Sequence, residues 1–162
     1  MEQSGGLMVG FYGRYTVLMD EKGRIALPAK FRPSVKADKD DDGHFMLTKG
    51  LDGCLALYPE REWELIQERL NTLDFTRKDY RYFSRLLYSV AVPIKLDRQG
   101  RLLIPSHLQE EARLEREILI LGANRWIELW SPGGYEQYLN QYGQSYEDVA
   151  EKLFDVNRQQ KE

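Results

Sequence analysis

The sequence contains few of the residues on which catalytic sites and secreted folds depend. It has one cysteine, Cys54, so no intrachain disulfide can form, and a reducing cytoplasm is the expected setting. A single free thiol usually packs as a small, inert hydrophobic side chain, so we expect Cys54 to be buried. The two histidines, His44 and His107, are far apart and lie in no catalytic motif. We therefore expect no enzymatic activity, no catalytic residue, no cofactor and no metal centre.

Long apolar runs are also missing. The longest ones fall far short of the roughly 20 residues that span a bilayer, and the first residues do not have the layout of a signal peptide. We therefore expect no membrane association. The hydrophobic content of 42% is ordinary for a globular protein, and 162 residues suffice for one domain with a core or for two intertwined halves.

The chain has no overall excess of positive charge, but this average conceals a segregated distribution. Lys and Arg number 23 against 26 Asp and Glu, which gives a net charge of −3. Residues 20–36 nevertheless carry five basic and two acidic side chains, and residues 95–101 carry three and one. The balancing negative charge lies in residues 38–42 and in the tail after Tyr135. Local basic patches of this kind attract polyanions such as nucleic acids.

The acidic stretch at residues 38–43 resembles the start of a calcium-binding loop, but the likeness fails farther along. Its sequence, DKDDDG, matches the first six positions of an EF-hand loop. The twelfth position should supply a bidentate glutamate and is Lys49 instead. The residues after Gly43 also predict a strand where an EF-hand has its exiting helix. We interpret the stretch as a surface loop.

What the sequence does contain is a segment that occurs twice. Residues 20–28 read DEKGRIALP, and residues 97–105, which lie 77 positions later, read DRQGRLLIP. Both have the form D-x-x-G-R followed by three apolar residues and a proline. The likeness continues downstream, where LALYP at residues 55–59 aligns with IELWS at residues 127–131. Self-similarity of this kind predicts two related halves.

Each half is expected to follow one plan: a strand, the D-x-x-G-R turn, a strand, a short helix, a loop, two strands and helices. In the first half we expect strand, turn and strand over residues 12–27, a helical turn from Pro28, and a hairpin over residues 45–58. Later helices are expected to begin with a capping box at Thr76 and a cap at Ser145. The predicted organisation is a mobile arm at residues 1–10, a first half at residues 11–90, a second half at residues 91–157 and a frayed tail at residues 158–162.

The repeated loop has a structural and a functional interpretation. As a plain hairpin turn, its aspartate would bond nearby backbone amides, its glycine would adopt a positive φ, and its arginine would be solvated. A turn alone does not require arginine directly after glycine in both copies, so we predict that Arg24 and Arg101 project outward together. Arginine suits that position because its planar fork binds phosphate or the O6/N7 edge of guanine in a bidentate manner. Loop-shaping roles are assigned to Asp20, Gly23, Asp97 and Gly100.

At these residues the chain resembles a known family. The two loops are similar to the D-x-x-x-R elements of the AbrB (SpoVT-AbrB) swapped-hairpin superfamily of bacterial DNA-binding proteins. The whole layout resembles the MraZ family of transcriptional regulators, which is associated with the division and cell-wall gene cluster. The matching segments fall within roughly residues 8–142 and are DEKGR at residues 20–24, GLDGCL at residues 50–55, Tyr58-Pro59 with Glu62-Trp63, and LDRQGR at residues 96–101.

The resemblance implies an α+β fold, mainly β with packed helices, in which two AbrB-like swapped-hairpin units are intertwined in one chain. It also implies a ring-shaped homo-oligomer, cytoplasmic and nucleoid-associated, with its loops on one face. Its expected partner is double-stranded DNA, at repeated G-rich boxes in its own promoter upstream of division and cell-wall genes. The residues expected at DNA are Arg24, Arg101, Lys22, Arg98, Lys30 and Arg32, of which the last four are expected to contact phosphates.

Two alternative functions are weighed against DNA binding. One is an AbrB-fold protein-protein interaction module, like an antitoxin half that binds a toxin. The presence of Arg24 and Arg101 in both loops favours DNA, whereas acidic residues there would favour a protein partner. The other is an enzyme with a site built from scattered residues, which the missing motifs disfavour.

Aromatic residues on the expected helix faces suggest how copies of the chain associate. They are more numerous than a core of this size obviously needs, although a wholly internal role remains the simpler interpretation. The residues concerned are Trp63, Tyr80, Phe83, Tyr135, Tyr138 and Tyr142. A head-to-tail contact between the helices of neighbouring protomers would bury them and would close into a ring where the rotation permits.

Overall fold

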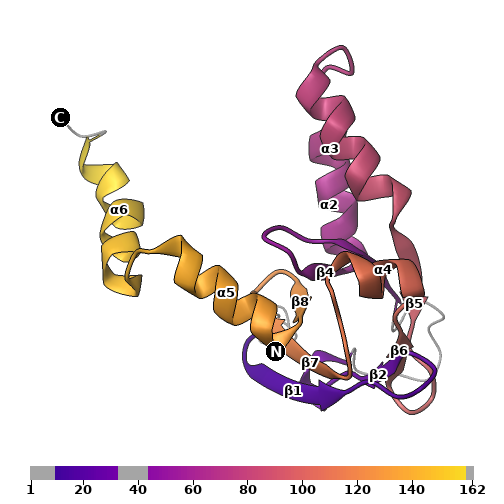
Figure 1. The fold of residues 1–162 in the computed structure, drawn as a ribbon. Coiled ribbons are helices and arrows are strands. Elements are labelled where there is room, and N and C mark those ends of the chain that lie inside the picture. The colour runs from indigo at the N-terminus through magenta and orange to yellow at the C-terminus, as the bar shows by residue number, and fades with distance from the viewer. Residues whose placement is uncertain (1–9, 33–43, 160–162) are drawn as a thin grey trace, which may run out of the picture.

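The computed structural model describes residues 10–32 and 44–159. Most of the arm expected at residues 1–10, the acidic stretch at residues 38–42 and the end of the tail lie outside the described residues. Figure 1 shows a small β body from which helices project. The elements are β1 (Arg14–Leu18), β2 (Arg24–Ala26), η1 (Ala29–Phe31), β3 (His44–Lys49), β4 (Leu55–Pro59), α2 (Glu60–Asn71), α3 (Lys78–Ser89), β5 (Val92–Lys95), β6 (Arg101–Leu103), α4 (Ser106–Glu111), β7 (Glu117–Gly122), β8 (Ile127–Trp130), α5 (Pro132–Tyr142) and α6 (Tyr146–Gln159).

The main sheet is built by exchange between the two halves. It is antiparallel, has six strands and follows the order β1-β7-β8-β4-β3-β5. β1 of the first half pairs with β7 of the second half, and β5 of the second half pairs with β3 of the first. A separate two-stranded sheet pairs β2 with β6. Each half thus adds its first strand to the hairpin of the other, and the expected α+β fold of two intertwined units is confirmed.

The centre of the sheet carries the core. β4 and β8 pair with Leu55 opposite Leu129 and Leu57 opposite Ile127, and all four side chains are fully buried. β4 has a continuous apolar sequence with its first three residues buried, as expected of a strand covered on both faces, whereas β8 carries Glu128 between Ile127 and Leu129. Cys54, directly before β4, is also buried, which confirms its expected burial, and desolvation raises the pKa of its thiol far above the ordinary value.

An ion pair between Glu62 and Arg125 joins the halves beside this core. Glu62, near the start of α2, accepts a bond of 2.6 Å from the guanidinium of Arg125, which lies between β7 and β8. Nearby, the carboxylate of Glu128 accepts hydrogen bonds of 3.0 Å from the indole nitrogens of Trp126 and Trp130. The Glu62 side chain is only 11% exposed, and a carboxylate so nearly buried requires a charged partner to offset its desolvation.

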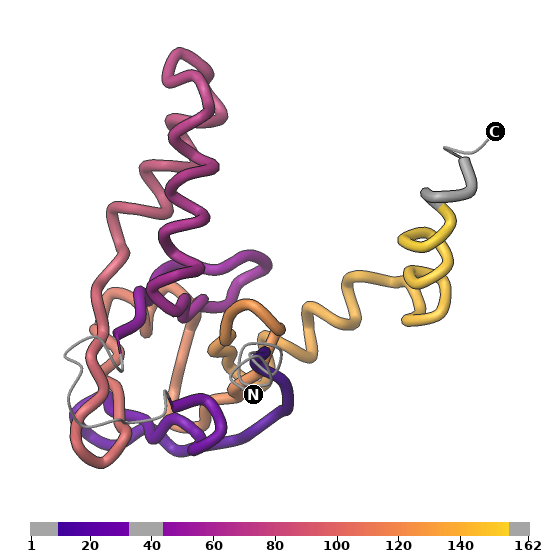
Figure 2. The backbone as a smooth tube through the Cα atoms, turned by 180° about the vertical axis from the view of Figure 1, so that it is seen from behind, coloured from indigo at the N-terminus to yellow at the C-terminus, as the bar shows by residue number. Residues whose placement is uncertain are grey.

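Two helical arms leave the β body in different directions (Figure 2). α2 and α3 form an antiparallel hairpin, and α5 and α6 extend away from β8. α6 is capped as expected, because Ser145 Oγ accepts the backbone N–H of Asp148 at 3.1 Å. The capping box expected at Thr76 is wrong: α3 begins after Arg77 without a side-chain cap. The Thr76 amide is instead bonded by Asp74 Oδ1, a local turn that competes with the cap.

The aromatic residues expected between protomers differ in their exposure to solvent. Trp63 is 7% exposed and belongs to the core of the α2–α3 hairpin, so it is not available for a contact between copies. It is buried because its ring lies between Tyr58 and Tyr88, with ring centroids 5.9 and 5.6 Å away. Of the others, Tyr80, Tyr135 and Tyr138 are half-buried, whereas Phe83 and Tyr142 are exposed.

Membrane-spanning helices and metal clusters are absent from the described residues. None of their helices is both long and apolar enough to cross a membrane. Within residues 10–32 and 44–159, no group of three or more His, Cys, Asp or Glu side chains is placed to hold a metal ion. Lys49, which occupies the twelfth position when the chain is aligned with a calcium-binding loop from Asp38, is ion-paired with Glu111 of α4.

Candidate nucleic-acid interface

The two repeated loops meet at the β2–β6 ribbon, seen at the lower right of Figure 1. The strands pair in antiparallel register with Ala26 opposite Arg101. Arg24 therefore lies diagonally across from Arg101 on the same face, with Cα atoms about 7–8 Å apart. Ile25 and Leu102 are each 1% exposed and lie on the opposite, core-facing side. The alternation of the strands thus brings both arginines to the outer face.

The first loop, residues 20–24, is closed by its aspartate. Asp20 Oδ1 accepts the backbone N–H groups of Lys22 and Arg24, each at 2.9 Å. Asp20 Oδ2 accepts the Nε–H of Arg24 at 2.8 Å. The carboxylate therefore shapes the turn and also holds the base of the guanidinium, so that the direction of the arginine is set before any ligand arrives.

The second loop, residues 97–101, repeats this geometry. Asp97 Oδ1 accepts the backbone N–H groups of Gln99 and Arg101 at 2.9 Å, and Oδ2 accepts the Nε–H of Arg101 at 2.9 Å. The tethered arginine side chains of the two loops have the same exposure, 31%. Since the hydrogen bond to aspartate uses Nε, the terminal nitrogens of each guanidinium stay available to a partner.

The glycine of each loop lies beneath a side chain from the other half. Gly23 and Gly100 have φ values of +84° and +75°, which glycine adopts readily and other residues do not. A Cβ on Gly23 would lie 2.7 Å from Gln109 Nε2, and a Cβ on Gly100 would overlap the guanidinium of Arg32. Gln109 was not among the expected site residues, although it stands 77 positions after Arg32, the same offset that separates the loops.

The remaining residues expected at DNA fall into two groups. Lys22 and Arg98 are exposed at the tips of the two loops, and Lys30 is exposed on η1. Arg32, at the end of η1, is half-buried, and its Nε donates to the backbone carbonyl of Leu27 at 2.8 Å. The first three side chains are exposed and can adjust their positions to the charges of a polyanion, whereas Arg32 is held in place by its hydrogen bond to Leu27.

Both loop aspartates are stronger acids than an ordinary aspartate. The backbone N–H of Arg24 contributes most to lowering the pKa of Asp20 below 3.8, and the backbone N–H of Arg101 does the same for Asp97. Each arginine side chain lowers the pKa further. Because the folded pKa is depressed, the stabilisation is complete above pH 3.8 and is lost as the pH falls through the lowered value. We expect an NMR titration to give each of the two loop carboxyl groups a midpoint below the ordinary aspartate value of 3.8.

Comparison with known proteins identifies the family. A family model described as "MraZ protein, putative antitoxin-like" matches the chain twice, over residues 11–86 and again over residues 87–157. The chain belongs to the MraZ family. Each of the two matches in this MraZ-family chain contains one copy of the D-x-x-G-R loop.

Curated relatives resemble the chain over nearly its whole length. "Transcriptional regulator MraZ" of Pelotomaculum thermopropionicum is 45% identical over 147 residues, which cover 91% of this chain and 97% of the relative. The protein of the same name from Heliobacterium modesticaldum is 44% identical, covering 91% of this chain and 99% of the relative. That from Syntrophomonas wolfei is 43% identical, covering 90% and 98%.

The tether in each loop leads to a prediction for the MraZ-family chain. Replacing Asp20 or Asp97 with alanine is expected to weaken DNA binding, although each change makes its loop more positive, because the arginine loses its fixed direction. Glu21→Gln is a matched control, since it removes the same charge from an exposed side chain of the first loop. Gel shifts at fixed salt compare the three variants. Aspartate variants that bind as tightly as Glu21→Gln, or tighter, would contradict an orienting role.

Proposed function

We propose that this MraZ-family chain is a sequence-specific, double-stranded-DNA-binding transcriptional regulator, and not an enzyme. The relatives bear the name transcriptional regulator, and the observation that carries the proposal is the pair of aspartate-tethered arginines on one outer face. In this proposal the protein acts in the cytoplasm at the nucleoid. Its targets are repeated G-rich boxes in its own promoter, upstream of division and cell-wall genes.

The spacing of the two arginines supports contact with neighbouring bases. Their Cα atoms are about 7–8 Å apart, which corresponds to about two base-pair steps at 3.4 Å each. Each guanidinium offers its terminal nitrogens to the O6 and N7 atoms of a guanine in the major groove. One protomer therefore reads two guanines of a short box, while Lys22, Arg98 and Lys30 contact the flanking phosphates.

A single protomer makes too few contacts with DNA for tight binding, and we propose that the protein acts as a ring-shaped homo-oligomer. A handful of phosphate contacts gives weak binding that falls steeply with salt. Several protomers on adjacent boxes gain affinity through effective concentration, without any new kind of contact. Repeated boxes on the DNA would then correspond to repeated loop pairs on one face of the ring.

The arm formed by α5 and α6 offers one side of the contact between copies. No side chain described in α6 is buried, and Tyr146, Leu153 and Phe154 are 87%, 67% and 77% exposed. Together with Val149 and Ala150, they form an apolar stripe along the helix. An amphipathic helix with such an uncovered stripe is typical of a segment that packs on another surface.

The α2–α3 hairpin offers the other side. It encloses, with the turn between β3 and β4, a groove of about 930 Å³. Apolar side chains dominate the lining, among them Leu51, Ile66, Leu73, Phe83 and Leu86. All of these side chains except Ile66 are exposed. The groove is therefore open to solvent and accessible to a helix from outside.

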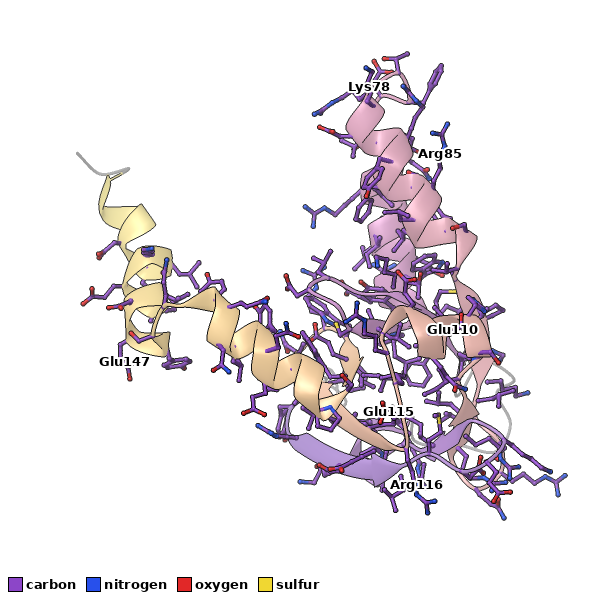
Figure 3. All side chains as sticks on the ribbon, viewed as in Figure 1. Lys78, Arg85, Glu110, Glu115, Arg116 and Glu147 are labelled. Atoms are coloured by element: carbon purple, nitrogen blue, oxygen red, sulfur yellow. The ribbon has the colours of Figure 1, made fainter. Side chains whose placement is uncertain are left out.

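We propose α6 of a second copy as the occupant of this groove. The charged side chains that line the groove are Lys49, Arg69 and Glu68, and α3, one of its walls, carries three basic side chains and one acidic one, whereas the described side chains of α6 include four acidic ones and one basic one. Figure 3 shows Lys78 and Arg85 on one arm and Glu147 on the other, with the two arms directed apart. The groove and α6 of one chain therefore do not meet, and a head-to-tail contact between these unlike surfaces closes into a ring where the rotation between copies permits.

A footprint on the DNA upstream of the gene for this protein tests the proposed function. Purified protein at moderate salt is expected to protect several evenly spaced G-rich boxes, with protection lost when the guanines are replaced. The alternative, an antitoxin-like protein-protein module, predicts no protection at any salt and a tight complex with a protein partner instead. An absence of protection would therefore overturn the proposal.

A further inference from the structure

The two loops have the same internal geometry, but different side chains lie over them. Gln109 of the second half covers Gly23 of the first loop, and Arg32 of the first half covers Gly100 of the second loop. The two covering residues occupy equivalent positions of the repeat, 77 residues apart. A neutral amide thus stands over one loop and a cation over the other.

Each covering side chain is anchored in the same way. Gln109 Nε2 donates to the carbonyl of Ile104 at 2.7 Å, and Arg32 Nε donates to the carbonyl of Leu27 at 2.8 Å. Ile104 and Leu27 also donate their backbone N–H groups to the loop glycines. Ile104 donates to the carbonyl of Gly23 at 2.8 Å, and Leu27 donates to the carbonyl of Gly100 at 3.0 Å. The glutamine and the arginine are therefore interchangeable as supports, and their difference is one of charge.

The charges of the loops add to this difference. The first loop, residues 20–24, has two acidic and two basic side chains, so its net charge is zero. The second loop, residues 97–101, has one acidic and two basic side chains, and Arg32 above it brings the total to +2. The hydrogen bond to the carbonyl of Leu27 already holds the Arg32 side chain. Binding a ligand therefore costs little additional conformational entropy of this side chain.

We propose that Arg32, together with Arg98, forms a subsite for a DNA backbone phosphate at the second loop, and that the first loop has no equivalent. This inference rests on the proposed DNA-binding function. The second loop then anchors the protein to the DNA backbone regardless of sequence, in addition to the guanine that Arg101 reads, whereas the neutral first loop contributes mainly through base recognition by Arg24. The two loops therefore have the same shape but contribute differently to DNA binding.

Exchanging the two covering residues tests the subsite. Arg32→Gln places at the second loop the side chain that already supports the first, so the hydrogen bond to the carbonyl is retained and folding is preserved. A protein that loses one phosphate contact has a salt slope smaller by about 0.9, so its affinity deficit shrinks about threefold between 50 and 200 mM salt. We expect this change for Arg32→Gln, equally on promoter DNA and on scrambled DNA. Gln109→Arg is expected to steepen the slope by a similar amount.

Arg61→Gln is the matched control, because it removes the same charge from an exposed site on α2 that is 76% accessible. Thermal unfolding of each variant verifies that the fold is intact. If Arg32→Gln and Arg61→Gln have the same salt slope, the phosphate subsite is refuted while the proposed function stands. If the wild-type protein does not bind promoter DNA, both the function and the subsite are refuted.

Discussion

Replacing Arg24 or Arg101 with alanine is expected to weaken binding to the promoter boxes by about 1–3 kcal/mol for each residue, which is roughly 5–150-fold. The loss follows from the geometry of the ribbon, where both side chains lie on the outer face and are fixed by an aspartate. Because the two arginines are close neighbours, the double variant need not show the sum of the single effects. Gel shifts on promoter and scrambled DNA at fixed salt measure the loss.

Two further variants separate base recognition from charge. Arg24→Lys keeps the charge but not the planar fork, so it is expected to lose specificity while keeping most of the salt dependence. Arg61→Ala on α2 is a control for the loss of an exposed arginine elsewhere, and it should leave affinity unchanged. Operator affinity that survives in the Arg24→Ala, Arg101→Ala double variant would refute the role of these residues at DNA.

The second large effect is expected at the contact between copies. Leu153→Glu on α6, or Phe83→Glu in the groove, places a charge in an apolar contact and should convert the assembly to monomers. Affinity for a promoter with all its boxes should then fall by about 10²–10⁴-fold, because avidity is lost, while affinity for a single box should change little. Static light scattering and gel shifts on full and single-box DNA measure the two effects.

Controls for this prediction use both surface position and charge. Tyr12→Glu alters an exposed aromatic residue before β1, outside both proposed surfaces, and should leave assembly intact. Reversing charge on α3 with Lys78→Glu and Arg85→Glu should weaken assembly, and adding Glu147→Lys should partly restore it. A wild-type protein that is monomeric at micromolar concentration would contradict the oligomer. Insertion of half a helical turn between boxes should also weaken binding, because the loops would face the wrong side of the DNA.

Much of the local structure follows from short-range patterns. Alternating apolar residues and the D-x-x-G-R turn predicted β1, β2 and the loop between them, and the same pattern predicted β5 and β6. The hairpin of β3 and β4 and the cap at Ser145 were also foreseen. Such features depend on hydrogen bonds between residues a few positions apart, so the sequence alone contains the necessary information.

Other features depend on residues far apart in the chain. The repeat predicted two related halves and the family resemblance implied that they intertwine, but neither predicted that Arg32 and Gln109 would each cover a glycine of the opposite loop. The pairing of Glu62 with Arg125 was likewise unforeseen. The common offset of 77 positions between Arg32 and Gln109 was the available signal, and it gains meaning only once the halves are known to face each other.

Burial could be inferred for whole strands, but not for every aromatic side chain. Trp63 was expected between protomers because helical periodicity gives an apolar face without saying what covers it. In the structure its own hairpin covers it, whereas the stripe that includes Leu153 and Phe154 has no cover within the described chain. Periodicity along the sequence identifies which side chains avoid water, and the packing of distant elements determines which of them find a partner in the same chain.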